Sequence, residues 1–198
     1  KFAKKGLMIL YTAPWPGQGF YTKFPVNSVS DFKGKKLRIY STATQQMGSM
    51  LGFNATILPF AEIPQAFSTG LIEALFTSPQ TGIDIQAWDN TKHFTYAGAI
   101  FSKNAVVVTK KAFNALSKGD QSNMLAAAKR AELRGWEMSA ETTKKQIGIL
   151  KKNGMSSKNA PDEVISKMKS IGLEMMKNWR SKASPEANAV LDRYLSMR

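Results

Sequence analysis

The chain of 198 residues contains no cysteine and a single histidine, His93. The lack of cysteine excludes disulfides, iron–sulfur clusters and cysteine-ligated zinc sites. The sequence also has no glycine-x-serine-x-glycine elbow, no Walker loop and no GxGxxG motif. A Ser-His-Asp triad stays open at this point, because its members can lie far apart in a sequence. We nevertheless expect no enzymatic activity, no cofactor and no metal site, and interpret His93 as a surface or strand-start residue.

Long apolar runs and acidic residues are also scarce. The apolar run Gly6–Ala13 is far shorter than the ~18–20 residues that cross a membrane, and indicates a buried strand. Against 28 Lys and Arg there are only 14 Asp and Glu, which gives a net charge of +14. This excess raises nucleic-acid or other polyanion binding as an alternative function. The lysines are scattered as pairs and no nucleic-acid-binding motif is present, so we favour solvated helix faces.

Short apolar segments alternate with segments of helical pattern through the first half of the chain. This alternation predicts an α/β fold with a mainly parallel sheet and helices on its faces. Pro14, Pro16, Gly17 and Gly19 predict a loop between the first two segments. We expect strands at 2–13, 35–40, 55–58, 72–76, 94–100 and 105–109, and helices at 42–51, 62–68 and 81–88.

The second half is helical in pattern. Residues 121–152 contain no proline, and predict either one long helix or two helices broken near Gly135. Pro161 opens a further helix, whose apolar stripe we expect to be core: Val164, Met168, Ile171, Met175 and Trp179. Ser184 begins the last helix, whose expected inner face consists of Val190, Leu191, Tyr194 and Leu195.

Arg38 is the residue with the clearest chemical meaning. Within 35–40 the side chains alternate, so that Leu37 and Ile39 face one way while Arg38 and Tyr40 face the other. A guanidinium near the end of a strand in an α/β fold lies where such folds bind anions, and its planar donors match a carboxylate. The alternative is an arginine that is solvated or paired with a neighbouring acid.

A series of residues around Arg38 resembles a known family. The pattern combines a turn before the strand, a helix ending in leucine-glycine, a strand ending in proline, and a helix followed by threonine-glycine and an acid. It comprises Asp31, Phe32, Lys33, Gly34, Arg38, Leu51, Gly52, Pro59, Glu62, Ala66, Thr69, Gly70 and Glu73. In this order the residues resemble the solute-binding proteins of tripartite ATP-independent periplasmic (TRAP) transporters, the DctP-like family.

The resemblance implies a two-lobe fold like that of periplasmic binding proteins, with a long connecting helix. It implies that the chain is a carboxy-terminal portion with an incomplete amino-terminal lobe, from a periplasmic protein whose signal peptide is removed. Residues 1–15 and 103–143 would then be a remnant of the first lobe with the long hinge helix, and residues 16–102 and 144–198 the second lobe. The function implied is capture of a small organic acid and its delivery to the TRAP membrane permease subunits.

The resemblance also implies a set of ligand-binding residues. Arg38 would hold the ligand carboxylate, and Phe60 would form an aromatic wall. Thr77 and Ser78 occupy the place of an asparagine in relatives, while Phe101 and Asn104 would line the hinge side. The last three, Trp15, Gln18 and Tyr21, lie where some relatives carry a second arginine. The ligand itself stays open, and a portion that binds nothing and self-associates is a further alternative.

Overall fold

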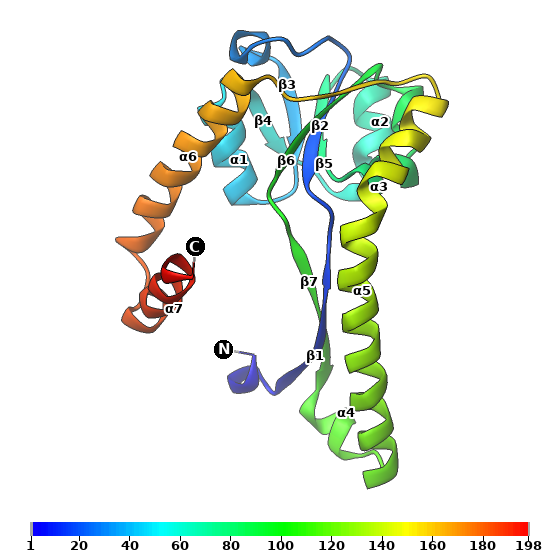
Figure 1. Cartoon of the computed structure of the whole chain (residues 1–198), viewed down its shortest axis with the longest axis vertical. Coiled ribbons are helices and arrows are strands. Elements are labelled where there is room, and N and C mark those ends of the chain that lie inside the picture. The colour runs from blue at the N-terminus through cyan, green and yellow to red at the C-terminus, as the bar shows by residue number, and fades with distance from the viewer. Residues whose placement is uncertain (1, 198) are drawn as a thin grey trace.

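The computed structural model describes residues 2–197 and contains two sheets (Figure 1). The larger has six strands in the order β4-β3-β5-β2-β6-β8, and the smaller pairs β1 with β7. The strands are β1 (Leu7–Pro14), β2 (Gln18–Thr22), β3 (Lys36–Ile39), β4 (Asn54–Ile57), β5 (Ala74–Thr77), β6 (His93–Ala99), β7 (Lys103–Thr109) and β8 (Ser156–Asn159). The α-helices are α1 (Thr42–Met50), α2 (Ile63–Ser68), α3 (Pro79–Asp84), α4 (Lys110–Asn114), α5 (Lys118–Lys152), α6 (Asp162–Arg180) and α7 (Pro185–Ser196). Short 3₁₀ helices are η1 (Ala3–Lys5), η2 (Val29–Phe32), η3 (Phe60–Glu62) and η4 (Ala87–Asp89).

The larger sheet is mixed, and its central strand β2 was not expected. β3 runs parallel to β4 and β5, and β6 runs parallel to β8, whereas β2 is antiparallel to both β5 and β6. The loop predicted from Pro14 to Gly19 therefore ends at Gly17, because β2 begins at Gln18. Gly19 marks a close approach rather than a turn, since a Cβ there would lie 2.5 Å from the Thr95 carbonyl oxygen. The α/β class is confirmed.

A long arm extends from this sheet. In Figure 1, β1 and β7 leave the larger sheet as an antiparallel ribbon, and α5 runs beside them. α5 is one helix of 35 residues with Gly135 in its interior, which excludes the two-helix alternative. A Cβ at Gly135 would lie 3.5 Å from Pro14 Cδ, so helix and ribbon approach closely there. The first predicted strand begins only at Leu7, because η1 precedes it and Gly6 adopts a left-handed turn with φ of 69°.

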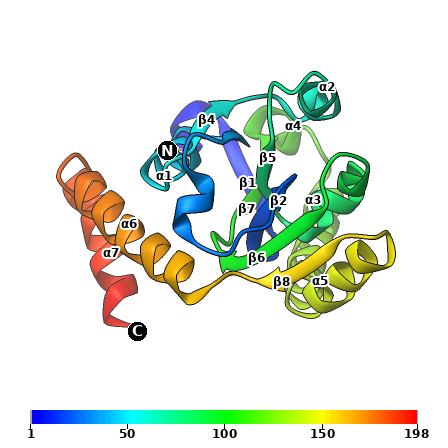
Figure 2. The ribbon, with the colours of Figure 1, turned by 90° about the horizontal axis from the view of Figure 1, so that it is seen from above.

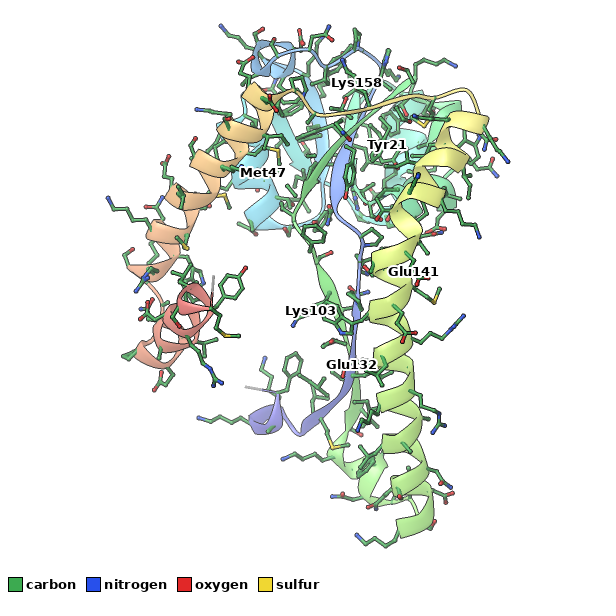
Figure 3. The ribbon with its side chains drawn as sticks, viewed as in Figure 1. Tyr21, Met47, Lys103, Glu132, Glu141 and Lys158 are labelled. Carbon is green, nitrogen blue, oxygen red and sulfur yellow. The ribbon has the colours of Figure 1, made fainter. Side chains whose placement is uncertain are left out.

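The arm is also held by a polar contact. The backbone N–H and the hydroxyl of Thr12 in β1 both donate to Oε1 of Glu132 in α5, at 2.9 and 2.6 Å. Figure 3 shows Glu132 on the side of α5 that faces the ribbon. These two bonds lower the pKa of the Glu132 carboxyl, chiefly through the Thr12 hydroxyl. Helix and ribbon are thereby joined far from the larger sheet.

Helices cover both faces of the larger sheet (Figure 2). One core cluster lies under α1 and α6, and includes the ring of Phe20, which packs on Phe32 and Phe76 at centroid distances of 4.9 and 4.8 Å. The second lies on the other face under α2, α3 and α5, and includes Tyr21, Phe67, Phe94 and Leu150. β2 is therefore buried on both faces, with Phe20 and Tyr21 both fully inaccessible.

The last two helices differ in part from expectation. Val164, Met168 and Ile171 are buried as predicted, but Trp179 is 49% exposed because α6 has by then left the sheet. α7 contains no fully buried residue. Of its predicted inner face Leu191 and Leu195 are half-buried, whereas Val190 and Tyr194 are 71% and 50% exposed. The polar contacts between α6 and α7 include the Arg180–Asp192 ion pair at 2.6 Å. None of the helices within residues 2–197 has the length and apolarity to cross a bilayer.

Candidate functional site

Arg38 lies inside the larger sheet, where β3 pairs with β4 and β5. Its partners across the two pairings are Thr56 and Leu75. Leu37 and Ile39 point into the core cluster under α1 and α6, and alternation directs Arg38 to the other face. Arg38 is only 5% exposed, so the strand places a guanidinium in a largely buried position.

Arg38 forms no ion pair with an acid of residues 2–197. Its Nε–H donates to the Leu58 carbonyl oxygen at 3.0 Å, which fixes the side chain. Within residues 2–197 the ion pairs are Lys35–Glu73 and Arg180–Asp192, and neither involves Arg38. Burial lowers the pKa of the guanidinium below its ordinary value, and nearby Tyr40 acts in the opposite direction. A buried cation without an acidic partner is costly, and an anion at this position would offset that cost.

A cavity opens beside this guanidinium. Its volume is about 530 Å³, within the usual range for a small-molecule site. The walls of the cavity come partly from the end of β5 and from α3. Other wall residues lie next to the point where the β1–β7 ribbon joins the larger sheet. The lining residues are Trp15, Gln18, Arg38, Tyr40, Phe60, Thr77, Ser78, Thr81, Asp84, Ser102 and Asn104.

Seven of the nine residues predicted as ligand contacts line this one cavity: Trp15, Gln18, Arg38, Phe60, Thr77, Ser78 and Asn104. They come from segments as distant in sequence as Trp15 and Asn104, and the fold brings them together. Gln18 connects several of these segments, because Tyr40 donates to its Oε1 at 3.0 Å and its Nε2 donates to Ser102 Oγ at 3.3 Å. Whether each residue contacts a ligand stays a prediction.

Ser78 has a structural task as well as a place in the wall. Its Oγ accepts from the Thr81 backbone N–H at 3.2 Å, which caps the N-terminus of α3. The Ser78 hydroxyl is also 3.0 Å from the Thr81 hydroxyl. A ligand would therefore meet an oxygen that is already engaged in holding the helix.

Tyr21 and Phe101, also predicted as ligand contacts, are not among the residues that line this cavity. Tyr21 belongs to β2 and is fully buried in the second core cluster (Figure 3). Its hydroxyl donates to the carbonyl oxygens of Ser78 and Pro79, at 3.2 and 3.4 Å. Burial, and secondarily Asp84, raise the pKa of Tyr21 well above its ordinary value. Phe101 is 71% exposed in the connection from β6 to β7.

Four lining residues were not predicted: Tyr40, Thr81, Asp84 and Ser102. Tyr40 could have been found, because it follows Arg38 by two positions on the same side of the strand. Thr81 and Asp84 follow Ser78 at steps of three along α3, so they share its face. Within residues 2–197 no group of acids and histidine is placed to hold a metal ion.

Comparison with known proteins agrees with this architecture. The family model described as "Bacterial extracellular solute-binding protein, family 7" (DctP) matches residues 1–182. The chain belongs to this family. A solute-binding protein of Chromohalobacter salexigens is 26% identical over 153 residues, which cover 73% of this chain and 45% of that protein. This chain therefore spans less than half the length of that curated relative.

Solved structures resemble the chain closely. The Bordetella pertussis extracytoplasmic solute receptor DctP7, which binds pyroglutamic acid, is 38% identical with a TM-score of 0.93; the match covers 97% of this chain and 64% of that one. A marine-metagenome TRAP solute-binding protein specific for pyroglutamate is 33% identical with a TM-score of 0.91, covering 98% and 64% of the two chains. The ectoine-binding protein of Halomonas elongata, at 19% identity and a TM-score of 0.87 over 98% and 64%, shares the fold.

The family assignment made from the residues around Arg38 is thus confirmed, together with the periplasmic-binding-protein-like fold and the periplasmic location. The matched solved proteins are described as extracytoplasmic receptors or TRAP binding proteins. The division into lobes at residues 1–15 with 103–143, and 16–102 with 144–198, stays a prediction.

Proposed function

We propose that the protein captures a small organic acid outside the cytoplasm and passes it to a TRAP-type membrane permease. The observation that carries this proposal is Arg38, a buried guanidinium without an acidic partner in the described chain, in the wall of a cavity. Its fixed Nε–H leaves the two terminal NH₂ groups to meet a carboxylate, which accepts two parallel hydrogen bonds. Binding would replace the water of the carboxylate with these donors.

The remaining lining suits an organic acid rather than an inorganic ion. Hydroxyl and amide groups of Gln18, Thr77 and Ser102 supply neutral hydrogen-bonding partners, while Trp15 and Phe60 supply apolar walls. Such a mixture orients a ligand of a few carbon atoms. Both of the solved relatives described above with more than 30% identity bind pyroglutamate, a cyclic acid with one carboxylate. Pyroglutamate is therefore the first ligand to test.

The same wall supports a mechanism of capture by closure. Trp15 and Asn104 lie at the start of the β1–β7 ribbon and Arg38 lies in the larger sheet, so the cavity spans the junction between arm and sheet. Bending at this junction would close the cavity over its ligand, as in other hinge-closing binding proteins. The closed form would then dock on the permease, which takes the ligand.

Isothermal titration calorimetry of the purified protein with a panel of organic acids tests the proposal. Truncating one member of a buried charge pair costs about 2–5 kcal/mol, so Arg38→Ala should weaken binding by roughly 30-fold or more. Arg130→Ala, which removes an exposed arginine from α5, is the matched control and should leave affinity unchanged. If Arg38→Ala bound every acid as the wild type does, Arg38 would not be the anchor.

A further inference from the structure

The cavity that contains Arg38 also contains one carboxylate, that of Asp84. Asp84 is the last residue of α3, where a negative charge is disfavoured by the helix dipole. It does not neutralise Arg38, because the ion pairs within residues 2–197 involve neither residue. An acid that opposes the local rule and lies in a ligand cavity is typical of a functional position.

A chain of hydrogen bonds holds this carboxylate in place. Gln146 of α5 is 7% exposed, and its Nε2 donates to Gln80 Oε1 at 2.9 Å. Gln80 Nε2 in turn donates to Asp84 Oδ1 at 2.7 Å, a short charge-assisted bond. Reversal of the Gln80 side-chain amide would place its oxygen against the Asp84 carboxylate, so these hydrogen bonds permit only one orientation of that amide.

Asp84 is exposed, and only one of its two carboxylate oxygens has a hydrogen-bond partner within residues 2–197. The relay from α5 therefore fixes the carboxylate through Oδ1, and Oδ2 stays available as an acceptor on this exposed residue of the cavity lining. An ionised carboxylate accepts hydrogen bonds and donates none. Its natural ligand partner is an N–H group or another strong donor.

The cavity thus has one cationic group, one anionic group and otherwise neutral polar and aromatic groups. On the basis of the proposed function, we propose that Asp84 determines specificity by accepting a hydrogen bond from an N–H of the bound acid while Arg38 holds its carboxylate. The ligand class is then a small acid with one carboxylate and one N–H donor, such as a lactam acid. Dicarboxylates are disfavoured, because a second carboxylate near Asp84 would be repelled.

Three acids of similar size separate the contributions. Pyroglutamate has the N–H, 3-oxocyclopentane-1-carboxylate replaces that N–H by a methylene, and glutarate has a second carboxylate. Calorimetry on the wild-type protein should give pyroglutamate an affinity about tenfold or more above that of the methylene analogue, as expected for a hydrogen bond to a charged group. Glutarate should bind more weakly than pyroglutamate.

The variant Asp84→Asn should weaken the preference for pyroglutamate and strengthen the binding of glutarate. Its preference for pyroglutamate over the methylene analogue should fall to within about threefold, because the charged acceptor is lost. Its affinity for glutarate should rise, because the repulsion is removed. Asp89→Asn is the matched control, since Asp89, like Asp84, is exposed and lines a neighbouring hollow, but it does not line this cavity. Gln80→Met tests the relay and should reduce the pyroglutamate preference without abolishing binding of the methylene analogue.

The outcomes distinguish the inference from the function on which it rests. Equal wild-type affinity for pyroglutamate and its methylene analogue would overturn the inference, as would an undiminished preference in Asp84→Asn. Binding of glutarate alone would also overturn it, although acid capture would stand. If the wild type bound no acid of the wider panel, the proposed function would fail and the inference with it.

Discussion

Gly82 offers a sharp test of how α3 is seated on the sheet beside the cavity. A Cβ at Gly82 would collide with the hydroxyl and ring of Tyr21. Tyr21 is fully buried and donates to the carbonyl oxygens of Ser78 and Pro79, so it has no room to withdraw. The variant Gly82→Ala must therefore displace α3, and with it the wall that holds Thr81 and Asp84.

Whether Gly82→Ala raises or lowers the free energy of unfolding shows whether α3 packs on Tyr21 in this way. Replacing glycine by alanine inside a helix stabilises by about 1 kcal/mol where nothing obstructs the methyl group. Overpacking a buried site costs about 1–3 kcal/mol, and each Tyr21 hydrogen bond that breaks removes about 1 kcal/mol more. We therefore expect Gly82→Ala to lower the free energy of unfolding by about 1–3 kcal/mol after the helical gain is subtracted.

Urea denaturation followed by circular dichroism measures this free energy. Gly172→Ala is the matched control, because Gly172 is an exposed glycine within α6 whose Cβ would meet nothing within 4 Å. It should stabilise by about 0.5–1 kcal/mol. Tyr21→Phe removes the hydroxyl that lies nearest, so it should relieve part of the Gly82→Ala defect in a double-mutant cycle. Stabilisation by Gly82→Ala equal to that by Gly172→Ala would refute the packing of α3 on Tyr21.

Two further predictions concern polar contacts. Because the pKa of Glu132 is lowered, its bonds to Thr12 contribute stability above the ordinary glutamate pKa of about 4.3, and this contribution is lost as the pH falls through the lower folded-state pKa. In urea denaturation at a series of pH values, Glu132→Gln should reduce this loss of stability at acid pH, whereas the control Glu137→Gln should not. Parallel curves of stability against pH for Glu132→Gln and the wild type would contradict the contact. Ser78→Ala should lower the free energy of unfolding by about 1 kcal/mol through loss of the α3 cap, with Ser78→Gly costing only a few tenths; an alanine variant as stable as the wild type would show that the cap is dispensable.

Local patterns sufficed to predict Arg38 but not its surroundings. Period-two alternation placed Leu37 and Ile39 in the core and Arg38 on the other face, as the structure has them. β2 escaped prediction because Gly17 and Gly19 signal a turn in sequence. In the fold, a Cβ at Gly19 would strike the neighbouring strand. A pattern cannot distinguish a glycine needed for a bend from one needed for close packing.

Tyr21 illustrates the consequence for the site. The family resemblance put Tyr21 where some relatives carry a second ligand-binding arginine, which requires its side chain to reach the cavity. Because β2 is instead a central strand with helices over both faces, Tyr21 turns into the core and only Gln18, at its start, remains in the wall. The prediction for α7 holds only in part, since Leu191 and Leu195 are half-buried but Val190 and Tyr194 are exposed. Amphipathic spacing shows which face is apolar, but not how much of it the described chain covers.

Asp84 could not be recognised from sequence because its significance depends on a contact across the fold. In sequence it is one of 14 scattered acids, and it lies in the middle of the helix expected at 81–88. Only the docking of α3 against α5 brings Gln80 within reach of Gln146, 66 positions away, and so turns Asp84 into an oriented acceptor. Arg38 is fixed by the larger sheet, and Asp84 is oriented through the helix that also forms the arm. A change in how α5 sits on α3 would therefore reach the anionic side of the cavity while leaving the cationic side in place, so selectivity can change without loss of the carboxylate anchor.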